Sequence, residues 1–147
     1  NFEGMWLDLS MEKTFIMIKP DGIRRGLAGT IIQRYEQKGL KITAAKLIMV
    51  PEELACKHYE EHVSKPFFQE LIANITSGPV LAMVLEGPNA IRLARLINGP
   101  TQIEEALPGT IRGDFATSTT ENLVHASDKP ETAEREIKLW MSYMNLA

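Results

Sequence analysis

Two short, almost unbroken apolar runs constrain the fold of this 147-residue chain more than any other feature. They extend from Thr14 to Ile18 and from Val80 to Leu85, and a Gly-Pro pair stands on each side of the second run. Apolar runs of this length without alternation are typical of strands that are buried on both faces of a sheet. We therefore expect a central sheet that is covered by helices.

Strand-length and helix-length segments alternate along the rest of the chain. We expect two further strands, at 41–50 and 123–126. The expected helices, with apolar residues at helical spacing, lie at 28–38, 52–61, 67–76, 89–98 and 130–144. This order fits an α+β fold of the ferredoxin-like sandwich type, with a four-stranded antiparallel sheet and flanking helices. Residues 99–113, rich in Gly and Pro, are expected to form a long functional loop.

The length of the chain fits a single domain, which we assign to residues 11–147. Residues 1–10 have apolar side chains but no basic segment or small-residue cleavage site, so they do not resemble a signal peptide. We interpret them as an added leader or as an extension that packs on a neighbour. No apolar run approaches the ~18 residues of a membrane span, so no membrane partner is expected.

Charge and cysteine content exclude some classes of protein. The net charge is −3 and the pI is about 5.7, whereas general nucleic-acid binders usually carry a basic face. We therefore expect that no nucleic acid is required for function. Cys56 is the only cysteine, which favours a reducing compartment and a cytoplasmic location.

One histidine is distinguished by its neighbours in the stretch N-L-V-H-A-S-D at 122–128. A short apolar run brings His125 to the end of an expected strand, and a helix is expected to follow with Asp128 as its N-cap and Pro130 in its first turn. A helix N-terminus favours anions, and neutral imidazole is a nucleophile at physiological pH. His125 is therefore a candidate phosphoryl acceptor. The alternative is a structural or solvated histidine, which is the commoner case.

Three cations are candidates for binding phosphate groups. Lys19 ends the first buried strand, Arg112 lies between glycines that let the backbone approach a ligand, and Arg95 lies off the apolar stripe of its helix. Phosphoryl transfer needs positioning and positive charge around the transferred group more than covalent help. The alternative is a solvated surface charge, as for most Lys and Arg side chains.

Three motifs together resemble the nucleoside diphosphate kinase family, in its order and spacing. They are K-P-D-G at 19–22, P-G-T-I-R-G-D-F at 108–115 and N-x-x-H-x-S-D at 122–128, and the resemblance runs from about Glu12 to about Met141. It implies the ferredoxin-like fold and ping-pong transfer of the γ-phosphate of a nucleoside triphosphate, typically ATP, through a phosphohistidine on His125. Nδ1 would be the attacking atom. Mg²⁺ would be held mainly by the nucleotide phosphates, without a protein metal ligand.

The resemblance also implies roles for individual residues. Glu136 and Ser127 would orient His125, and Lys19 would be both catalytic and phosphate-binding. The residues implied in nucleotide binding are Lys19, Arg95, Arg112 and Thr101 at the phosphates, Tyr59 at the β- and γ-phosphates, Asn122 at the sugar 3′-hydroxyl, and Phe67 and Thr119 on the two faces of the base. Thr119 stands where the family often has a branched aliphatic residue.

The last helix gives an independent indication for Glu136. Ala133, Ile137 and Trp140 lie on one apolar stripe, and Glu136 lies at its edge, from where a carboxylate can turn towards His125. Arg135 is expected to point away from the stripe into solvent. The alternative for Glu136 is an ordinary salt bridge on the surface of the helix.

Other readings of the sequence are weaker. H-x-x-E-H at 58–62 matches an inverted zinc-protease motif, but no third ligand is evident. No P-loop motif G-x-x-x-x-G-K-[ST] is present. A non-catalytic nucleotide-binding or interaction module of the same fold is the alternative function.

The resemblance implies a homo-oligomer, for which we expect a hexamer, with a tetramer or dimer as alternatives. The sequence has T-Q-I at 101–103 where the family commonly has T-N-P.

Overall fold

The computed structural model describes residues 11–144, which form a four-stranded sheet with helices on both faces. The strands are β1 (Met11–Ile18), β2 (Lys41–Met49), β3 (Pro79–Pro88) and β4 (Val124–Ala126). Their order in the sheet is β2-β3-β1-β4, and each neighbouring pair is antiparallel. This arrangement confirms the predicted ferredoxin-like fold.

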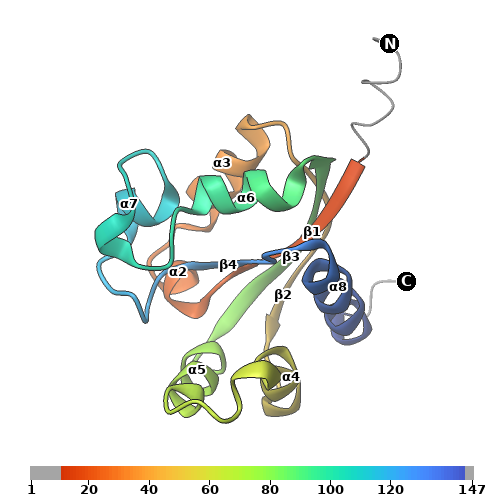
Figure 1. The fold of residues 1–147 in the computed structure, drawn as a ribbon, viewed down its shortest axis with the longest axis vertical. Coiled ribbons are helices and arrows are strands. Elements are labelled where there is room, and N and C mark those ends of the chain that lie inside the picture. The colour runs from red at the N-terminus through yellow and green to blue at the C-terminus, as the bar shows by residue number, and fades with distance from the viewer. Residues whose placement is uncertain (1–10, 145–147) are drawn as a thin grey trace.

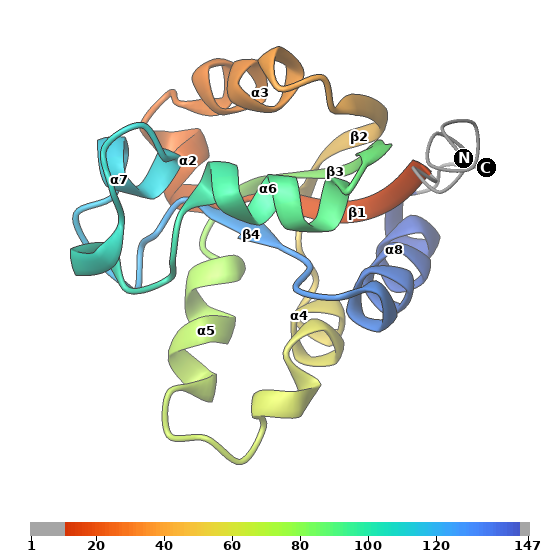
Figure 2. The same ribbon diagram turned by 45° about the horizontal axis from the view of Figure 1, so that its top comes forward.

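Helices form a layer on each side of the sheet (Figures 1 and 2). The helices are α2 (Pro20–Arg24), α3 (Ala28–Gln37), α4 (Glu52–His58), α5 (Phe68–Ile75), α6 (Ala90–Asn98), α7 (Ile111–Phe115) and α8 (Pro130–Met144), with 3₁₀ turns η1 (Glu60–His62) and η2 (Ile103–Glu105). In Figure 1, α3 and α6 lie above the sheet, and α4, α5 and α8 lie below it.

The central strand β1 is buried on both faces, as its apolar run predicted. Ile16 and Ile18 pack into a core with α3 and α6, whereas Phe15 and Met17 pack into a second core that includes Trp140 of α8. Alternate residues of a strand point to opposite faces, so one strand anchors both layers. β1 pairs with β4 as well as β3, and this pairing fixes the position of the histidine on β4.

The structure differs from the prediction mainly where short helices occur. α2 forms in a segment for which no helix was expected, α7 begins within the expected loop at 99–113, and the helix expected at 52–61 ends at His58. α8 begins at Pro130, and the N–H of Ala133 bonds to the carbonyl of Lys129, so Lys129 and not Asp128 occupies the N-cap position. Gly39 follows α3 with φ +91°, a left-handed conformation that is typical of a glycine just after the end of a helix.

No helix within residues 11–144 is long and apolar enough to cross a membrane. The predicted leader or extension at 1–10 lies outside the described residues.

Candidate active site

His125 lies on β4, paired with Met17 of β1, and is held through one ring nitrogen. Its Nε2 is 2.9 Å from Oε1 of Glu136, a buried carboxylate on α8. The hydroxyl of Ser127 donates to the same oxygen at 2.7 Å. Among residues 11–144, no hydrogen-bond partner is found for Nδ1 of His125. The ring is therefore held on one side, by the carboxylate that also accepts from Ser127, and open on the other.

The charge on Glu136 determines which nitrogen of His125 carries the proton. Burial alone would raise the pKa of Glu136, but the neighbouring His125 and His58 and the hydroxyl of Ser127 hold it below its ordinary value. Glu136 is therefore ionised at neutral pH and accepts hydrogen bonds. In neutral His125 the proton is on Nε2, which leaves the Nδ1 lone pair available as a nucleophile.

Lys19 stands directly after β1, beside the loop that leads to β4. Its ammonium donates to Oδ1 of Asn122 at 2.8 Å. Burial, and next the charge of Arg112, lower the pKa of Lys19 to about 8, although Asp21 acts in the opposite direction. The ammonium is thus close to its titration range while no anion is bound.

Arg112 of α7 is locked in place by backbone carbonyls. It is buried and donates to the carbonyls of Gly99 at 2.7 Å, Val124 at 2.6 Å and Asn122 at 3.2 Å. Burial lowers its pKa to about 10, which leaves it charged at neutral pH. Arg95 of α6 donates to the carbonyl of Ala126 at 3.0 Å. Both guanidinium groups are therefore anchored beside the strand that carries His125.

A cavity of about 550 Å³ opens in front of His125. All the residues that were implied in nucleotide binding line it: Lys19, Tyr59, Phe67, Arg95, Thr101, Arg112, Thr119 and Asn122. Glu136 and Ser127 do not line it, because they are buried behind the ring of His125. A larger cavity of about 740 Å³ lies beside α6 and shares Arg95, but it contains no histidine. The smaller cavity is therefore the candidate active site.

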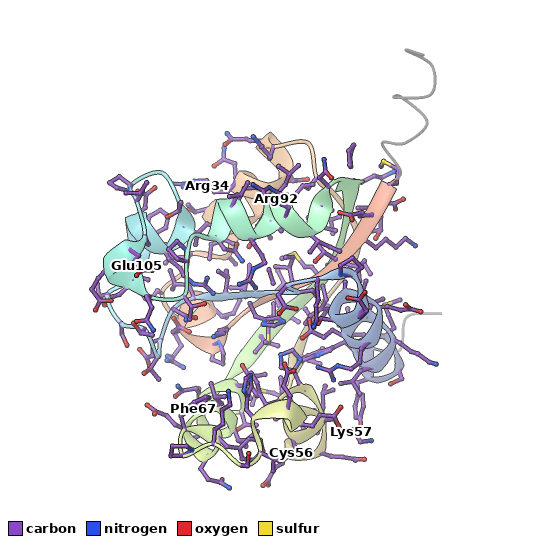
Figure 3. The ribbon with its side chains drawn as sticks, in the orientation of Figure 1. Arg34, Cys56, Lys57, Phe67, Arg92 and Glu105 are labelled. Atoms are coloured by element: carbon purple, nitrogen blue, oxygen red, sulfur yellow. The ribbon has the colours of Figure 1, made fainter. Side chains whose placement is uncertain are left out.

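The outer part of this cavity is aromatic. Phe67 lies immediately before α5, and 43% of its surface is exposed (Figure 3). The next residue, Phe68, is buried in the core. Burial and then the charge of Glu136 raise the pKa of Tyr59, so its hydroxyl keeps its proton. An exposed ring at the rim can stack on a flat ligand.

The side chains of residues 11–144 do not form a cage of oxygen ligands for Mg²⁺. Within residues 11–144, only His58, His125 and Glu136 come close enough together to share a metal ion. Mg²⁺ prefers oxygen ligands in octahedral geometry, whereas this set offers two imidazoles and one carboxylate that is already hydrogen-bonded. His62 is absent from this cluster, so the zinc-protease motif at 58–62 is not assembled.

Sequence reasoning missed the role of Asp21. Its carboxylate accepts a 3.0 Å hydrogen bond from the backbone N–H of Leu123, and the N–H of Lys19 donates to the carbonyl of Leu123 at 2.8 Å. Leu123 has φ +77°, which is unusual for a residue with a side chain. Asp21 therefore stabilises the sharp bend that leads into β4. The only indication of this role in the sequence was the place of Asp21 in the K-P-D-G motif.

The prediction for Arg135 was wrong. Its guanidinium approaches the backbone carbonyls of Lys57 and His58, at 3.3 and 3.4 Å, and so joins α8 to the end of α4. Periodicity placed this side chain off the apolar stripe, but it could not show that α4 lies there.

Comparisons with known proteins agree with this site. A family model described as nucleoside diphosphate kinase matches residues 12–146. A nucleoside diphosphate kinase from Caldanaerobacter subterraneus subsp. tengcongensis is 62% identical over 130 residues, which are 88% of this chain and 94% of that protein. One from Archaeoglobus fulgidus is 57% identical over 132 residues, 90% of this chain and 87% of that protein.

Solved structures agree as well. A halophilic nucleoside diphosphate kinase from Halobacterium salinarum, in complex with CDP, is 50% identical with a TM-score of 0.87, covering 89% of this chain and 88% of that one. The apo enzyme from Encephalitozoon cuniculi is 48% identical with a TM-score of 0.87, covering 88% of each chain. By sequence and by structure, this chain belongs to the nucleoside diphosphate kinase family.

Proposed function

We propose that the chain transfers phosphoryl groups between nucleotides by a ping-pong reaction through a phosphohistidine on His125. The observation that carries this proposal is the asymmetry of the histidine. Nε2 bonds to buried Glu136, while the opposite side of the ring faces a cavity lined by Lys19, Arg95 and Arg112. A nucleophile that is oriented on one side and surrounded by cations on the other suits phosphoryl transfer.

In the first half-reaction, the Nδ1 lone pair of His125 attacks the γ-phosphorus of a nucleoside triphosphate. The bond to the bridging oxygen breaks, and the nucleoside diphosphate leaves with that electron pair. In the second half-reaction, the terminal phosphate oxygen of another diphosphate attacks the phosphohistidine, and the N–P bond breaks. Mg²⁺ enters as part of the substrate, bound to the β- and γ-phosphates, since the side chains here do not fit it.

Nucleotide binding follows from the lining of the cavity. Lys19, Arg95 and Arg112 neutralise the phosphates, with the hydroxyl of Thr101 as a further donor and Tyr59 at the β- and γ-phosphates. Phe67 stacks on the base and Thr119 covers its other face, which binds bases without reading their edges. Asn122 bonds to the sugar 3′-hydroxyl. The CDP complex of the Halobacterium salinarum relative supports a nucleotide ligand for this fold.

We further propose that the protein acts in the cytoplasm as a homo-oligomer built from single-domain subunits, most simply a hexamer. Residues 101–103 read T-Q-I, where the family commonly has T-N-P. Multi-angle light scattering measures the assembly directly. A mass of two or four subunits would replace the hexamer with a dimer or tetramer.

Labelling of the enzyme by γ-³²P-ATP with Mg²⁺, followed by a GDP chase, tests the reaction. We expect acid-labile, alkali-stable label that moves to GTP, no label on His125→Asn, and normal label on the control Glu134→Gln, at an exposed position of α8. Nucleotide binding without any label on the wild type would overturn the kinase proposal and favour a non-catalytic nucleotide-binding module.

A further inference from the structure

A second histidine, His58, lies buried behind His125 and has no part in the reaction as proposed. Its ring meets that of His125 edge to face, with centroids 4.6 Å apart and an angle of 79° between the planes. It contacts Tyr59 in the same manner, also at 4.6 Å. Trp140 of α8 donates its indole N–H to Nδ1 of His58 at 3.1 Å. The three-member chain Trp140–His58–His125 thus joins α8, α4 and β4.

The bond from Trp140 determines where His58 carries its proton. An indole nitrogen can only donate, so Nδ1 of His58 must accept and cannot carry a hydrogen. The ring is therefore the neutral form with its proton on Nε2. Nδ1 of His58 is also 3.8 Å from Oε2 of Glu136. A proton on Nδ1 would replace its lone pair with an N–H donor close to the carboxylate of Glu136.

Such a donor would compete for Glu136. Its other oxygen, Oε1, already receives Nε2 of His125 and the hydroxyl of Ser127. Closing the 3.8 Å gap to an ordinary hydrogen bond of ~2.9 Å would draw the carboxylate towards His58 and weaken its hold on His125. The geometry therefore gives the indole N–H an indirect influence on the nucleophile.

We propose that Trp140 is a positioning residue for phosphoryl transfer, because its N–H holds His58 in the form that cannot donate to Glu136 and so reserves that carboxylate for His125. This inference rests on the proposed function, since it concerns the orientation of the same histidine. It assigns a purpose to a buried polar contact between two side chains 82 positions apart in the sequence.

The surrounding charges act in the same direction. Burial, and then His125, hold the pKa of His58 well below the ordinary histidine value, and Arg135 and Lys19 add to this effect. Glu136 alone acts in the opposite direction. The environment thus keeps His58 uncharged, while Trp140 selects the nitrogen that carries its proton.

The proton position on His58 can be measured without any catalysis. In ¹⁵N NMR of histidine-labelled wild-type protein at pH 7, we expect His58 as the neutral Nε2–H tautomer. A His58 with its proton on Nδ1, or a doubly protonated ring, would overturn the proposal. This result does not depend on turnover, so it is separable from a failure of the proposed kinase reaction.

The variant Trp140→Phe tests the consequence for catalysis. Trp140 stacks on Phe15 at 4.8 Å, so phenylalanine keeps a ring there and removes the N–H. The loss of one hydrogen bond changes the ratio of the two neutral tautomers of His58 by about fivefold. Without that bond, part of the neutral His58 can carry its proton on Nδ1, so we expect phosphoenzyme formation to slow by at most about that factor, and to the same extent at pH 7 and pH 8.

The double variant His58→Asn/Trp140→Phe, compared with His58→Asn, is the matched control. The asparagine amide that replaces the imidazole has no second tautomer, so the loss caused by Trp140→Phe must disappear in the double variant. A Trp140→Phe protein that thermal melting shows to be folded, and that is phosphorylated at the wild-type rate, would overturn the proposal. So would a loss of the same size in the double variant.

Discussion

The ammonium of Lys19 donates a 2.8 Å hydrogen bond to the side-chain oxygen of Asn122, 103 positions away in the sequence. The amide of Asn122 in turn donates to the carbonyl of Thr119 at 2.9 Å. Lys19 is thereby held in place just after the end of β1 before any ligand is present. Burial and the nearby Arg112 lower its pKa to about 8 at the same time. The position of this cation is predetermined, but its charge is sensitive to pH.

Nucleotide affinity should therefore fall in alkali. Phosphate oxygens favour the charged form of Lys19, so binding raises its pKa above the free value of about 8 and takes up a proton. Affinity for a nucleoside diphosphate should decrease between pH 8 and 9.5, by at most about tenfold per pH unit. Calorimetric titration measures this slope. Lys19→Met should bind more weakly, with a flat profile over the same range, and a flat wild-type profile would contradict the argument.

Replacement of Glu136 by Gln should slow phosphorylation of His125 by about 10²-fold while nucleotide affinity stays nearly unchanged. The carboxylate accepts hydrogen bonds from both His125 and Ser127. A neutral amide is a weaker acceptor, so it stabilises the Nε2–H form of His125 less. Rapid-quench measurement of the phosphoenzyme separates this effect from binding. Glu134→Gln, at an exposed position of the same helix, is the control and should match the wild type.

Arg112→Lys should impair both stability and binding. Its three carbonyl contacts need the planar guanidinium fork, which an ammonium cannot reproduce. We expect a loss of about 3 kcal/mol in the free energy of unfolding, because buried carbonyls lose charged donors. Urea denaturation tests this, with Arg92→Lys on the exposed side of α6 as a control that should be neutral. Equal stability of the two variants would contradict the structural role.

Gly113→Ala should prevent α7 from packing. A Cβ at this position would lie 1.9 Å from the carbonyl oxygen of Leu107, and backbone cannot move aside cheaply. We expect a loss above ~4 kcal/mol, seen as a lowered urea midpoint or as insoluble protein. By contrast, Gly29→Ala in α3 meets nothing within 4 Å and should stabilise the protein by up to ~1 kcal/mol. A Gly113→Ala protein as stable as the wild type would refute this packing.

The sequence predicted the sheet and the long helices because hydrophobic periodicity reports burial. It did not predict α2 and α7, since each has five residues and is too short to show a period. Their existence depends on tertiary contacts, as when the carboxylate of Asp114 accepts from Gly109 and from Arg34 of α3. Such contacts join segments whose proximity no local pattern reveals.

For the same reason, the sequence indicated some residues of the candidate site but not the contacts between them. Lys19, Arg112 and Asn122, which line the cavity, lie in recognisable motifs, and helical spacing placed Glu136 at the edge of a buried stripe. Nothing in the sequence indicated that Trp140 would donate to His58. Both side chains are buried, and whether their nitrogen atoms meet depends on how α4 packs against α8. The motif at 58–62 suggested a metal site instead.

The position of α8 has a consequence for the order in which the site forms while the chain is synthesised. The hydroxyl oxygen of Ser127 accepts a 3.3 Å hydrogen bond from the backbone N–H of Phe15, 112 positions earlier, and the carboxylate bonded to His125 lies on the helix that follows. A growing chain that has emerged only as far as β4 already has the histidine and its surrounding cations, but not the carboxylate. Full competence for phosphorylation therefore depends on the docking of the last helix, and we expect chains that lack this helix to be phosphorylated slowly.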